Sequence, residues 1–492
     1  MLRKVRRLLA AIAFVLITLL FLDFTGTLHA WFGWLARIQF LPALLALNVG
    51  VVVMLVAITL LFGRVYCSVI CPLGVMQDVV SHVSGSRKGK KRRFSYSPAL
   101  SWLRYGVLIV FVVALVAGVG SLAMLLAPYS SYGRMAQNLL QPVYILGNNL
   151  LAMIAERMDS YAFYEREVWL RSMPVFIIAA VTFVIIAVLA WRGGRTYCNT
   201  VCPVGTVLGF LSRYSWLRMR IDSDKCNHCG LCARSCKAAC IDAKNSVIDY
   251  SRCVACGNCQ TVCNKNAIRY IPGGMAKTGG GSADTARRSF LIGAAAVTST
   301  AMLAQEKKKV DGGLAAIEDK TVPHRDTPIT PPGSLSAQNM AQHCTACQLC
   351  VAVCPNDVLR PSGDLTKLMQ PTMSYERGYC RPECVKCSEV CPAGAIKPIT
   401  VADKSSTQIG HAVWVKKNCI PITDGVECGN CARHCPAGAI TMISSDPKDG
   451  NAPKIPAVNT ARCIGCGACE NLCPARPLSA IYVEGHEVHK EI

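Results

Sequence analysis

The sequence predicts an α-helical membrane domain joined to two small, cysteine-rich α+β domains. Three observations lead to this fold class. Long apolar runs lie before residue 192, closely spaced cysteines repeat from residue 226 onward, and a further apolar run near residue 290 divides the cysteine-rich part in two. We therefore expect four spanning helices, a first cysteine-rich domain, one internal anchor helix and a second cysteine-rich domain, in that order.

The four apolar runs have lengths suited to crossing a bilayer. A helix needs about 20 mainly apolar residues to span the hydrocarbon core. The first run is short, but no small-residue cleavage site follows it before Asp23, so we expect a helix that is retained in the lipid bilayer. The runs are residues 8–22, 41–62, 105–127 and 174–191.

Basic residues gather in the segments next to the apolar runs that are predicted to lie on the same side of the membrane as the N-terminus. Arg3 and Arg6 precede the first run, residues 87–93 follow the second, and Arg192 and Arg195 follow the fourth. Cytoplasmic loops carry an excess of Lys and Arg, so we expect these segments in the cytoplasm. The net charge of +22 therefore needs no nucleic acid to explain it, and we expect no nucleic-acid partner.

All but one of the 29 cysteines fall into two repeated patterns. In the first pattern, three cysteines share a short loop and can hold three corners of an iron-sulfur cubane, while a fourth, after three intervening residues, can ligate the neighbouring cluster. The copies are Cys226, Cys229, Cys232 and Cys236; Cys253, Cys256, Cys259 and Cys263; Cys344, Cys347, Cys350 and Cys354; Cys380, Cys384, Cys387 and Cys391; Cys419, Cys428, Cys431 and Cys435; and Cys463, Cys466, Cys469 and Cys473.

Two other uses of cysteine explain this pattern less well. Disulfides between such close neighbours would close small, strained loops. Zinc also binds four thiolates, but a zinc site does not explain why three closely spaced cysteines followed by a fourth occur six times. We therefore expect six [4Fe-4S] clusters in two α+β ferredoxin-like domains, two clusters in the first and four in the second. Within the four-cluster domain two arrangements are open, with neighbouring motifs paired or with first paired to fourth and second to third.

The second pattern is GRxYCxxxCPxG, and it occurs around Cys67 and Cys71 and again around Cys198 and Cys202. One copy follows the second predicted helix and the other follows the fourth, so both emerge at the same face of the membrane. This arrangement indicates that the two halves are parallel repeats. We hypothesise that the four thiols form one redox site with an additional metal or cluster. Two independent dithiols, or turns in which the prolines end helices, are the alternatives.

Cys240 is the one cysteine outside both patterns. It stands where other copies of the first motif have Ala267, Ala395 and Ala439. A seventh ligand is one interpretation, and a small buried residue behind the loop is the favoured one.

The middle of the chain predicts a crossing of the membrane. Arg287 and Arg288 precede an alanine-rich apolar segment, the form of a signal that exports folded, cofactor-loaded proteins. The alternative is an ordinary anchor helix with Arg287 and Arg288 as flanking charges, and it would place the same segments on the same sides of the membrane. The expected domains are 1–215 (four membrane helices), 216–272 (two clusters), 273–286 (Gly-rich linker), 287–305 (anchor helix), 306–338 (linker) and 339–492 (four clusters).

A chain with six one-electron carriers and no motif for nucleotide binding or hydrolysis is expected to transfer electrons. Tyr129, Tyr132, Arg134 and Gln137 offer polar and aromatic groups at the outer membrane interface and form a candidate quinol site. The alternative is an interfacial aromatic belt with an arginine that snorkels to the surface.

These motifs resemble two known families. The first part, with four helices, two CxxxCP motifs and a two-cluster ferredoxin, is similar to the NapH-type membrane ferredoxins. The second part, with twin arginines, Pro331, Pro332 and four clusters, resembles the NapG and MauM ferredoxins. The fusion of both in one chain departs from that pattern.

The resemblance implies a quinol dehydrogenase module in the inner membrane. It would pass electrons from the membrane quinol pool to a periplasmic redox enzyme or electron carrier, with the two-cluster domain cytoplasmic and the four-cluster domain periplasmic. Two other roles stay open. One is a maturation or regulatory protein that reduces a metal or cofactor of a partner, as NosR-like and FixG-like relatives do, and the other is an iron-sulfur redox sensor.

Protein loaded under anaerobic conditions should contain about 24 iron atoms per chain, four for each of six clusters. Iron and acid-labile sulfide assays on the same sample measure this. Zinc as the main metal, or iron sufficient for only two clusters, would contradict the six-cluster prediction.

Overall fold

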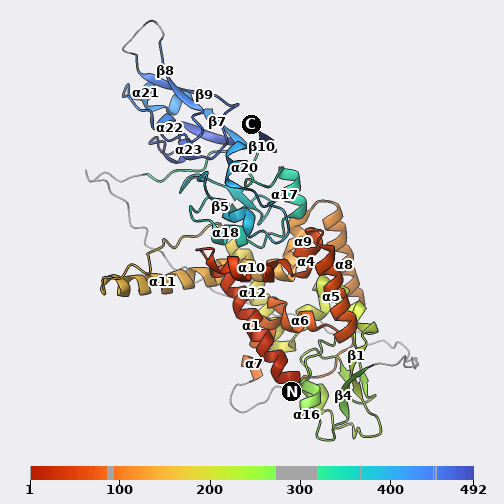
Figure 1. The fold of residues 1–492 in the computed structure, drawn as a ribbon. Coiled ribbons are helices and arrows are strands. Elements are labelled where there is room, and N and C mark those ends of the chain that lie inside the picture. Colours follow the sequence, from red (N-terminus) through yellow and green to blue (C-terminus); the bar gives the residue numbers. More distant parts are fainter. Residues whose placement is uncertain (1, 86–93, 273–317, 366, 447, 449–451) are drawn as a thin grey trace, which may run out of the picture.

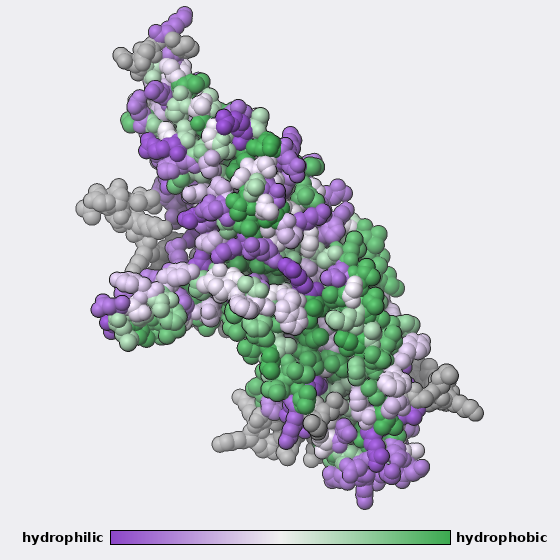
Figure 2. Space-filling view, viewed as in Figure 1, coloured by the Kyte–Doolittle hydropathy of each residue, from purple (hydrophilic) through white to green (hydrophobic). Residues whose placement is uncertain are grey.

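The computed structural model describes residues 2–85, 94–272 and 318–492, without 366, 447 and 449–451. A helical bundle occupies the middle of the molecule, with one cysteine-rich domain at each end (Figure 1). The N-terminus lies beside the first of these domains, and the C-terminus lies in the second. Figure 2 shows hydrophobic side chains gathered over the bundle, while hydrophilic ones predominate at both ends.

Two helices are long and apolar enough to cross a membrane. They are α1 (Leu2–Leu22) and α12 (Met173–Gly193), which contain two of the predicted spans. Their lipid-compatible outer surface is extensive, since Leu8 and Ile177 are more than half exposed. The predicted fifth helix, residues 287–305, lies outside the described residues.

The prediction of four continuous spans is wrong for the second and third runs. The second divides into α4 (Phe40–Leu45) and α5 (Val49–Phe62), because Leu47 adopts a positive φ and Asn48 caps α5 by accepting a hydrogen bond from Val51 N. The third divides at Gly118, also at positive φ, into α8 (Ser101–Val116) and α9 (Gly120–Leu126). The structure therefore does not establish a four-helix membrane domain.

Both GRxYCxxxCPxG segments fold in the same way. After α5 the chain turns at Gly63 into α6 (Val65–Val69) and α7 (Pro72–Gly85). After α12 it turns at Gly194 into α13 (Thr196–Thr200), α14 (Pro203–Leu211) and η2 (Ser212–Tyr214). Helix α7 packs against α1, α10 and α12, whereas α14 packs against α5 and α8. Each helix that follows a motif is thus enclosed by the bundle.

Several short helices cover the end of the bundle next to the second cysteine-rich domain (Figure 1). Tight contacts hold that domain in place, and a Cβ atom on Gly133 would lie 2.4 Å from the carbonyl oxygen of Cys347. The helices of this region are α2 (Thr27–Phe32), α3 (Trp34–Arg37), α10 (Pro128–Met135), the π-helix η1 (Ala136–Leu140) and α11 (Gln141–Glu156).

The first cysteine-rich domain is a small α+β unit, as its ferredoxin-type motifs predict. Strand β1 (Leu217–Ile221) pairs antiparallel with β4 (Ile268–Pro272), and β2 (Ile241–Asp242) pairs with β3 (Val247–Ile248). Helices α15 (Leu231–Ser235) and α16 (Asn258–Val262) carry the third cysteine of each motif. The short elements bring Cys236 of the first motif and Cys259 of the second into one buried core.

The second cysteine-rich domain repeats this architecture twice. Its three two-stranded antiparallel sheets pair β5 with β6, β7 with β10 and β8 with β9. The strands are β5 (Leu359–Pro361), β6 (Pro371–Met373), β7 (Thr407–Trp414), β8 (Ile440–Ser444), β9 (Lys454–Val458) and β10 (Ile481–Glu491). The helices are α17 (Ala337–His343), α18 (Leu349–Val353), α19 (Lys386–Glu389), α20 (Val401–Ser406), η3 (Lys416–Asn418), α21 (Ile420–Thr423), α22 (Asn430–Arg433) and α23 (Ala468–Asn471).

Candidate iron-sulfur sites and a buried four-cysteine centre

The two motifs of the first cysteine-rich domain share their cysteines. A cavity is lined by Cys253, Cys256 and Cys259 of one motif together with Cys236 of the other. This is the arrangement in which the fourth cysteine of each motif ligates its partner's cluster. The complementary set is Cys226, Cys229, Cys232 and Cys263.

The second cysteine-rich domain contains three cavities built in the same way. In each, three cysteines of one motif meet the fourth cysteine of the adjacent motif. The first has Cys380, Cys384 and Cys387 with Cys354; the second has Cys419, Cys428 and Cys431 with Cys473; the third has Cys463, Cys466 and Cys469 with Cys435. Neighbouring motifs therefore pair, and the alternative of first with fourth is wrong.

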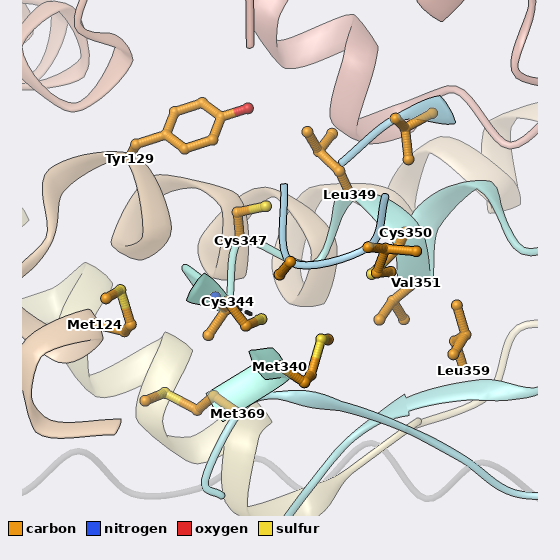
Figure 3. Close-up of a cluster of buried hydrophobic side chains, with 14 of the residues drawn as sticks. Met124, Tyr129, Met340, Cys344, Cys347, Leu349, Cys350, Val351, Leu359 and Met369 are labelled. Atoms are coloured by element: carbon orange, nitrogen blue, oxygen red, sulfur yellow. Dashed lines mark hydrogen bonds between the residues drawn. The ribbon is translucent and has the colours of Figure 1, made fainter. Parts of the chain in front are cut away.

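The remaining set, Cys344, Cys347 and Cys350 with Cys391, lies against the bundle. Cys344, Cys347 and Cys350 are buried in the same hydrophobic core as Met124 and Tyr129 of the bundle (Figure 3). Asn138 Nδ2 of η1 also donates a hydrogen bond of 3.1 Å to Gln348 Oε1. This set thus lies directly on the bundle, and the adjacent set is also held there, because Lys386, which lines its cavity, donates to Thr25 O at 2.9 Å.

The donor sets fit [4Fe-4S] clusters. Backbone N–H groups point at several of the fourth cysteines, with 3.3 Å from Ala267 N to Cys263 Sγ and from Ala439 N to Cys435 Sγ. Such hydrogen bonds stabilise thiolates and tune cluster potentials. Among the residues that the structure describes, no three metal-ligating side chains gather around a single-ion position. The thiols instead surround open cavities.

Burial affects the protonation of these thiols. It raises the pKa of Cys431 to about 11 and that of Cys466 to about 12. Without a bound cluster these groups are therefore protonated at neutral pH. Because ligands must be deprotonated, cluster insertion has to release protons from them.

The cysteines of the second pattern lie together inside the bundle. Cys67, Cys71, Cys198 and Cys202 are each 4% exposed and belong to one continuous core. Arg64 Nη2 lies 3.9 Å from Cys67 Sγ and donates to the carbonyl oxygen of Cys198 at 3.3 Å, so one side chain contacts both motifs. Gln77 Nε2 donates to Cys198 Sγ at 3.1 Å. We call these four residues the four-cysteine centre.

The arginine of each motif binds the other motif. Arg64 contacts Cys198 O and also donates to Asn199 Oδ1 at 3.0 Å, while Arg195 Nη1 donates to Cys67 O at 2.7 Å. Both guanidinium groups are buried. Arg195 is fixed in turn by two bonds of 2.8 Å to the Asp78 carboxylate. These crossed contacts bring the two repeats together.

The remaining motif positions also have local functions. Pro203 begins α14, where its missing N–H costs nothing, and Cys202 Sγ accepts a hydrogen bond from Gly205 N at 3.3 Å. A Cβ on Gly205 would lie 2.4 Å from Cys198 O, and one on Gly74 would lie 2.3 Å from Cys67 O. Sequence reasoning identified the cysteines but not the role of Arg64, Arg195 or Asp78. The arginine that both copies of the GRxYCxxxCPxG pattern share is the sequence feature that could have indicated the role of Arg64 and Arg195.

The four-cysteine centre adjoins the first cysteine-rich domain. Arg64 Nη1 donates to Ser251 O at 3.0 Å, two residues before Cys253. Arg195 N donates to Lys237 O at 2.9 Å, one residue after Cys236. Both contacts are made to backbone within two residues of Cys236 or Cys253, which line the cavity that we call the inner cavity.

The candidate quinol residues lie at the opposite side of the centre, on α10 and η1. Tyr129, Tyr132, Arg134 and Gln137 are at most 4% exposed. Arg134 Nη1 donates to Met124 O at 2.9 Å, so the alternative of a snorkelling arginine is wrong. The hydroxyl of Tyr129 is buried and has no hydrogen-bond partner among the described residues.

Comparisons with known proteins agree with these sites. Residues 44–91 and 173–223 match a 4Fe-4S binding domain, and residues 249–358 and 426–476 match 4Fe-4S dicluster domains. The ferredoxin-type protein NapG of Escherichia coli is 31% identical over 176 residues, which cover 33% of this chain and 75% of NapG. The methylamine utilization ferredoxin-type protein MauM of Paracoccus denitrificans is 32% identical over 165 residues, 32% of this chain and 73% of MauM.

The chain belongs to the NapG and MauM family of ferredoxin-type proteins. It is also similar to the ferredoxin-type protein NapH of Escherichia coli, with 26% identity over 236 residues, 46% of this chain and 68% of NapH. No solved structure matches it. This polyferredoxin is an iron-sulfur electron-transfer protein. In the described part of the chain, two helices have the length and apolar composition of membrane spans.

One match differs from the structure in how it groups the motifs. The dicluster match at 249–358 joins the motif of Cys253 to that of Cys344. In the structure Cys253 shares its cavity with Cys236, and Cys344 lies in the other domain. The match at 426–476 agrees with the cavities, because both group the motifs of Cys428 and Cys463.

The paired cavities predict how double substitutions combine. Cys354→Ser and Cys380→Ser affect the same cavity, so the double variant should lose the iron of one cluster, about four atoms, as either single variant does. Cys354→Ser with Cys344→Ser affects two cavities and should lose about eight. Iron analysis after anaerobic loading measures both. If the second pair lost only one cluster, each motif would hold its own cluster and the shared arrangement would be excluded.

Proposed function

We propose that this chain carries electrons from the membrane quinol pool to a periplasmic redox enzyme or electron carrier. The observation that carries the proposal is the position of the four-cysteine centre between two cluster-binding domains. The relatives support the general role, since they include the putative electron transport protein YccM of Escherichia coli, 24% identical over 228 residues, 45% of this chain and 55% of YccM.

The two domains lie at opposite ends of α1. Arg3 Nη1, at its start, donates to Thr261 Oγ1 of the first domain at 3.0 Å. Beyond its end, Thr25 O accepts from Lys386 Nζ of the second domain at 2.9 Å. The 21 residues of α1 rise about 30 Å, close to the thickness of the hydrocarbon core. This length supports a cytoplasmic two-cluster domain and a periplasmic four-cluster domain in the inner membrane.

Electron tunnelling decays exponentially with distance, so a direct step across that span would be slow. The proposed route therefore includes the four-cysteine centre, where the four thiols would hold an additional cluster. Iron-sulfur clusters supply one-electron carriers when bound at the cysteine sets on either side. Arg64 and Arg195 position the centre by fixing the backbone on which Cys67 and Cys198 lie.

Quinol oxidation also requires groups that accept protons and bind an apolar ring. The proposed site uses Tyr129, Tyr132, Arg134 and Gln137, which are buried between the bundle and Cys347. The Tyr129 hydroxyl has a free hydrogen-bonding capacity, and the Tyr132 hydroxyl lies 2.5 Å from Thr18 Oγ1. The Arg134 guanidinium would favour the negative charge left by a departing proton.

The function can be tested with purified protein in nanodiscs, kept anaerobic and mixed with a reduced quinol. The visible absorbance of the clusters should bleach, and an added soluble acceptor should then sustain turnover. Tyr129→Phe should slow bleaching at least several-fold, whereas Tyr144→Phe, at a site 41% exposed, should not. Absence of bleaching in the unmodified protein would contradict quinol oxidation. Bleaching without turnover would instead support a sensor or maturation role.

The four-cysteine centre can be tested separately. Because ligands of one site act as a unit, Cys67→Ser or Cys198→Ser should give the same loss of electron transfer as replacing all four cysteines. Metal bound beyond the six clusters should disappear in each variant. Ser68→Ala is the matched control, since Ser68 is buried beside Cys67 but its hydroxyl only donates to Val65 O. Partial losses that add together would indicate two independent dithiols.

A further inference from the structure

Cys240 is a fifth thiol on the inner cavity. It is 1% exposed and lines the cavity together with Cys236, Cys253, Cys256 and Cys259. Its Sγ lies 3.5 Å from Cys236 Sγ, within hydrogen-bonding distance for sulfur. Cys253 Sγ is its other hydrogen-bonding neighbour. It therefore contacts two of the four cysteines of one cluster set.

The equivalent position in the other motifs has no polar side chain. Counted from the fourth cysteine, it is Ala267, Ala395 and Ala439 in three copies and Val358 in another. Ala267 and Ala439 contribute only a backbone N–H to the preceding cysteine sulfur, at 3.3 Å in both cases. Among the described residues at this motif position, Cys240 alone places a side-chain donor beside the ligand sulfurs. The other three cavities for which the structure gives a lining contain no fifth cysteine.

The favoured expectation of a small buried residue explains the burial of Cys240 but not its contacts. A seventh ligand is also unnecessary, because Cys236, Cys253, Cys256 and Cys259 already form a complete set of four. We propose that Cys240 remains a thiol and donates its S–H to the sulfur of Cys236 or Cys253, raising the reduction potential of the inner-cavity cluster.

The direction of the effect follows from electrostatics. A hydrogen bond to a ligand sulfur withdraws negative charge from the cluster and so favours the reduced form, which carries one more electron. Burial strengthens the effect because water does not compete for the sulfur. Cys240 is thus a positioning and tuning residue that acts through the ligands.

The location gives the tuning a consequence that rests on the proposed function. The inner cavity is the one that Arg64 and Arg195 join to the four-cysteine centre. A higher potential there would hold an electron at the junction between the bundle and the first domain. The outer set, with Cys226 and Cys229, would then be reduced less readily.

The test compares three variants of the full chain in redox titrations followed by electron paramagnetic resonance. Cys240→Val keeps an apolar side chain of similar size, as Val358 provides elsewhere, but removes the donor. It should shift one cluster midpoint to a lower potential, leave the other five unchanged and keep the iron content. Cys240→Ala should give the same shift, whereas Cys240→Ser keeps a donor and should retain more of the original potential.

Two results would overturn the proposal. Unchanged midpoints in both Cys240→Val and Cys240→Ala would show that the thiol does not tune a cluster. Loss of about four iron atoms in these variants would show that Cys240 is needed to hold the cluster. The titration uses dithionite and no quinol, so its outcome is independent of whether the chain oxidises quinol.

Discussion

The buried carboxylate of Asp78 connects the parts of this molecule. From α7 it binds Arg195 with two hydrogen bonds, forms an ion pair with Lys237 of the first cysteine-rich domain, and lies 3.6 Å from Arg6 of α1. Removing one partner of a buried ion pair costs about 3–5 kcal/mol, because the other charge stays buried without compensation. The orientation of Arg195, and with it the backbone of Cys67, therefore depends on this carboxylate.

The crossed arginines show why the two motifs are repeated. Arg64 contacts the backbone of the second motif and Arg195 contacts that of the first. Arg195 finds acceptors at Cys67 O and at the Asp78 carboxylate, in and just after the first motif. Arg64 also binds Ser251 O, but Cys198 O and Asn199 Oδ1 of the second motif are two of its acceptors. The two repeats therefore stabilise each other. This mutual dependence places four thiols in one core. It relies on contacts between distant parts of the sequence, which a local sequence pattern does not reveal.

The two cysteine-rich domains rely on a different constraint. Their strands are short, from two to eleven residues, and the cysteines line cavities where a larger domain would have an apolar core. Cluster binding is then coupled to folding, because ligands that meet only in the folded state contribute binding energy to it. The inner cavity, the set around Cys344 and the set around Cys380 lie next to the bundle, the last through the contact of Lys386 with Thr25 O. The bundle thus holds the two cluster domains at their nearest cysteine sets.

The sequence by itself predicted the cysteine sets of the candidate cluster sites, because ligand spacing in each motif is local and the chemistry of a cubane demands it. It also determined α1 and α12, whose uninterrupted apolar lengths are enough to define a helix. It did not determine the breaks near Leu47 and Gly118, since a hydropathy pattern carries no information about backbone dihedral angles. Tertiary structure alone decided the pairing of neighbouring motifs, the burial of Arg134 and the contacts of Cys240. Each of these depends on residues distant in sequence that meet only when the chain is packed.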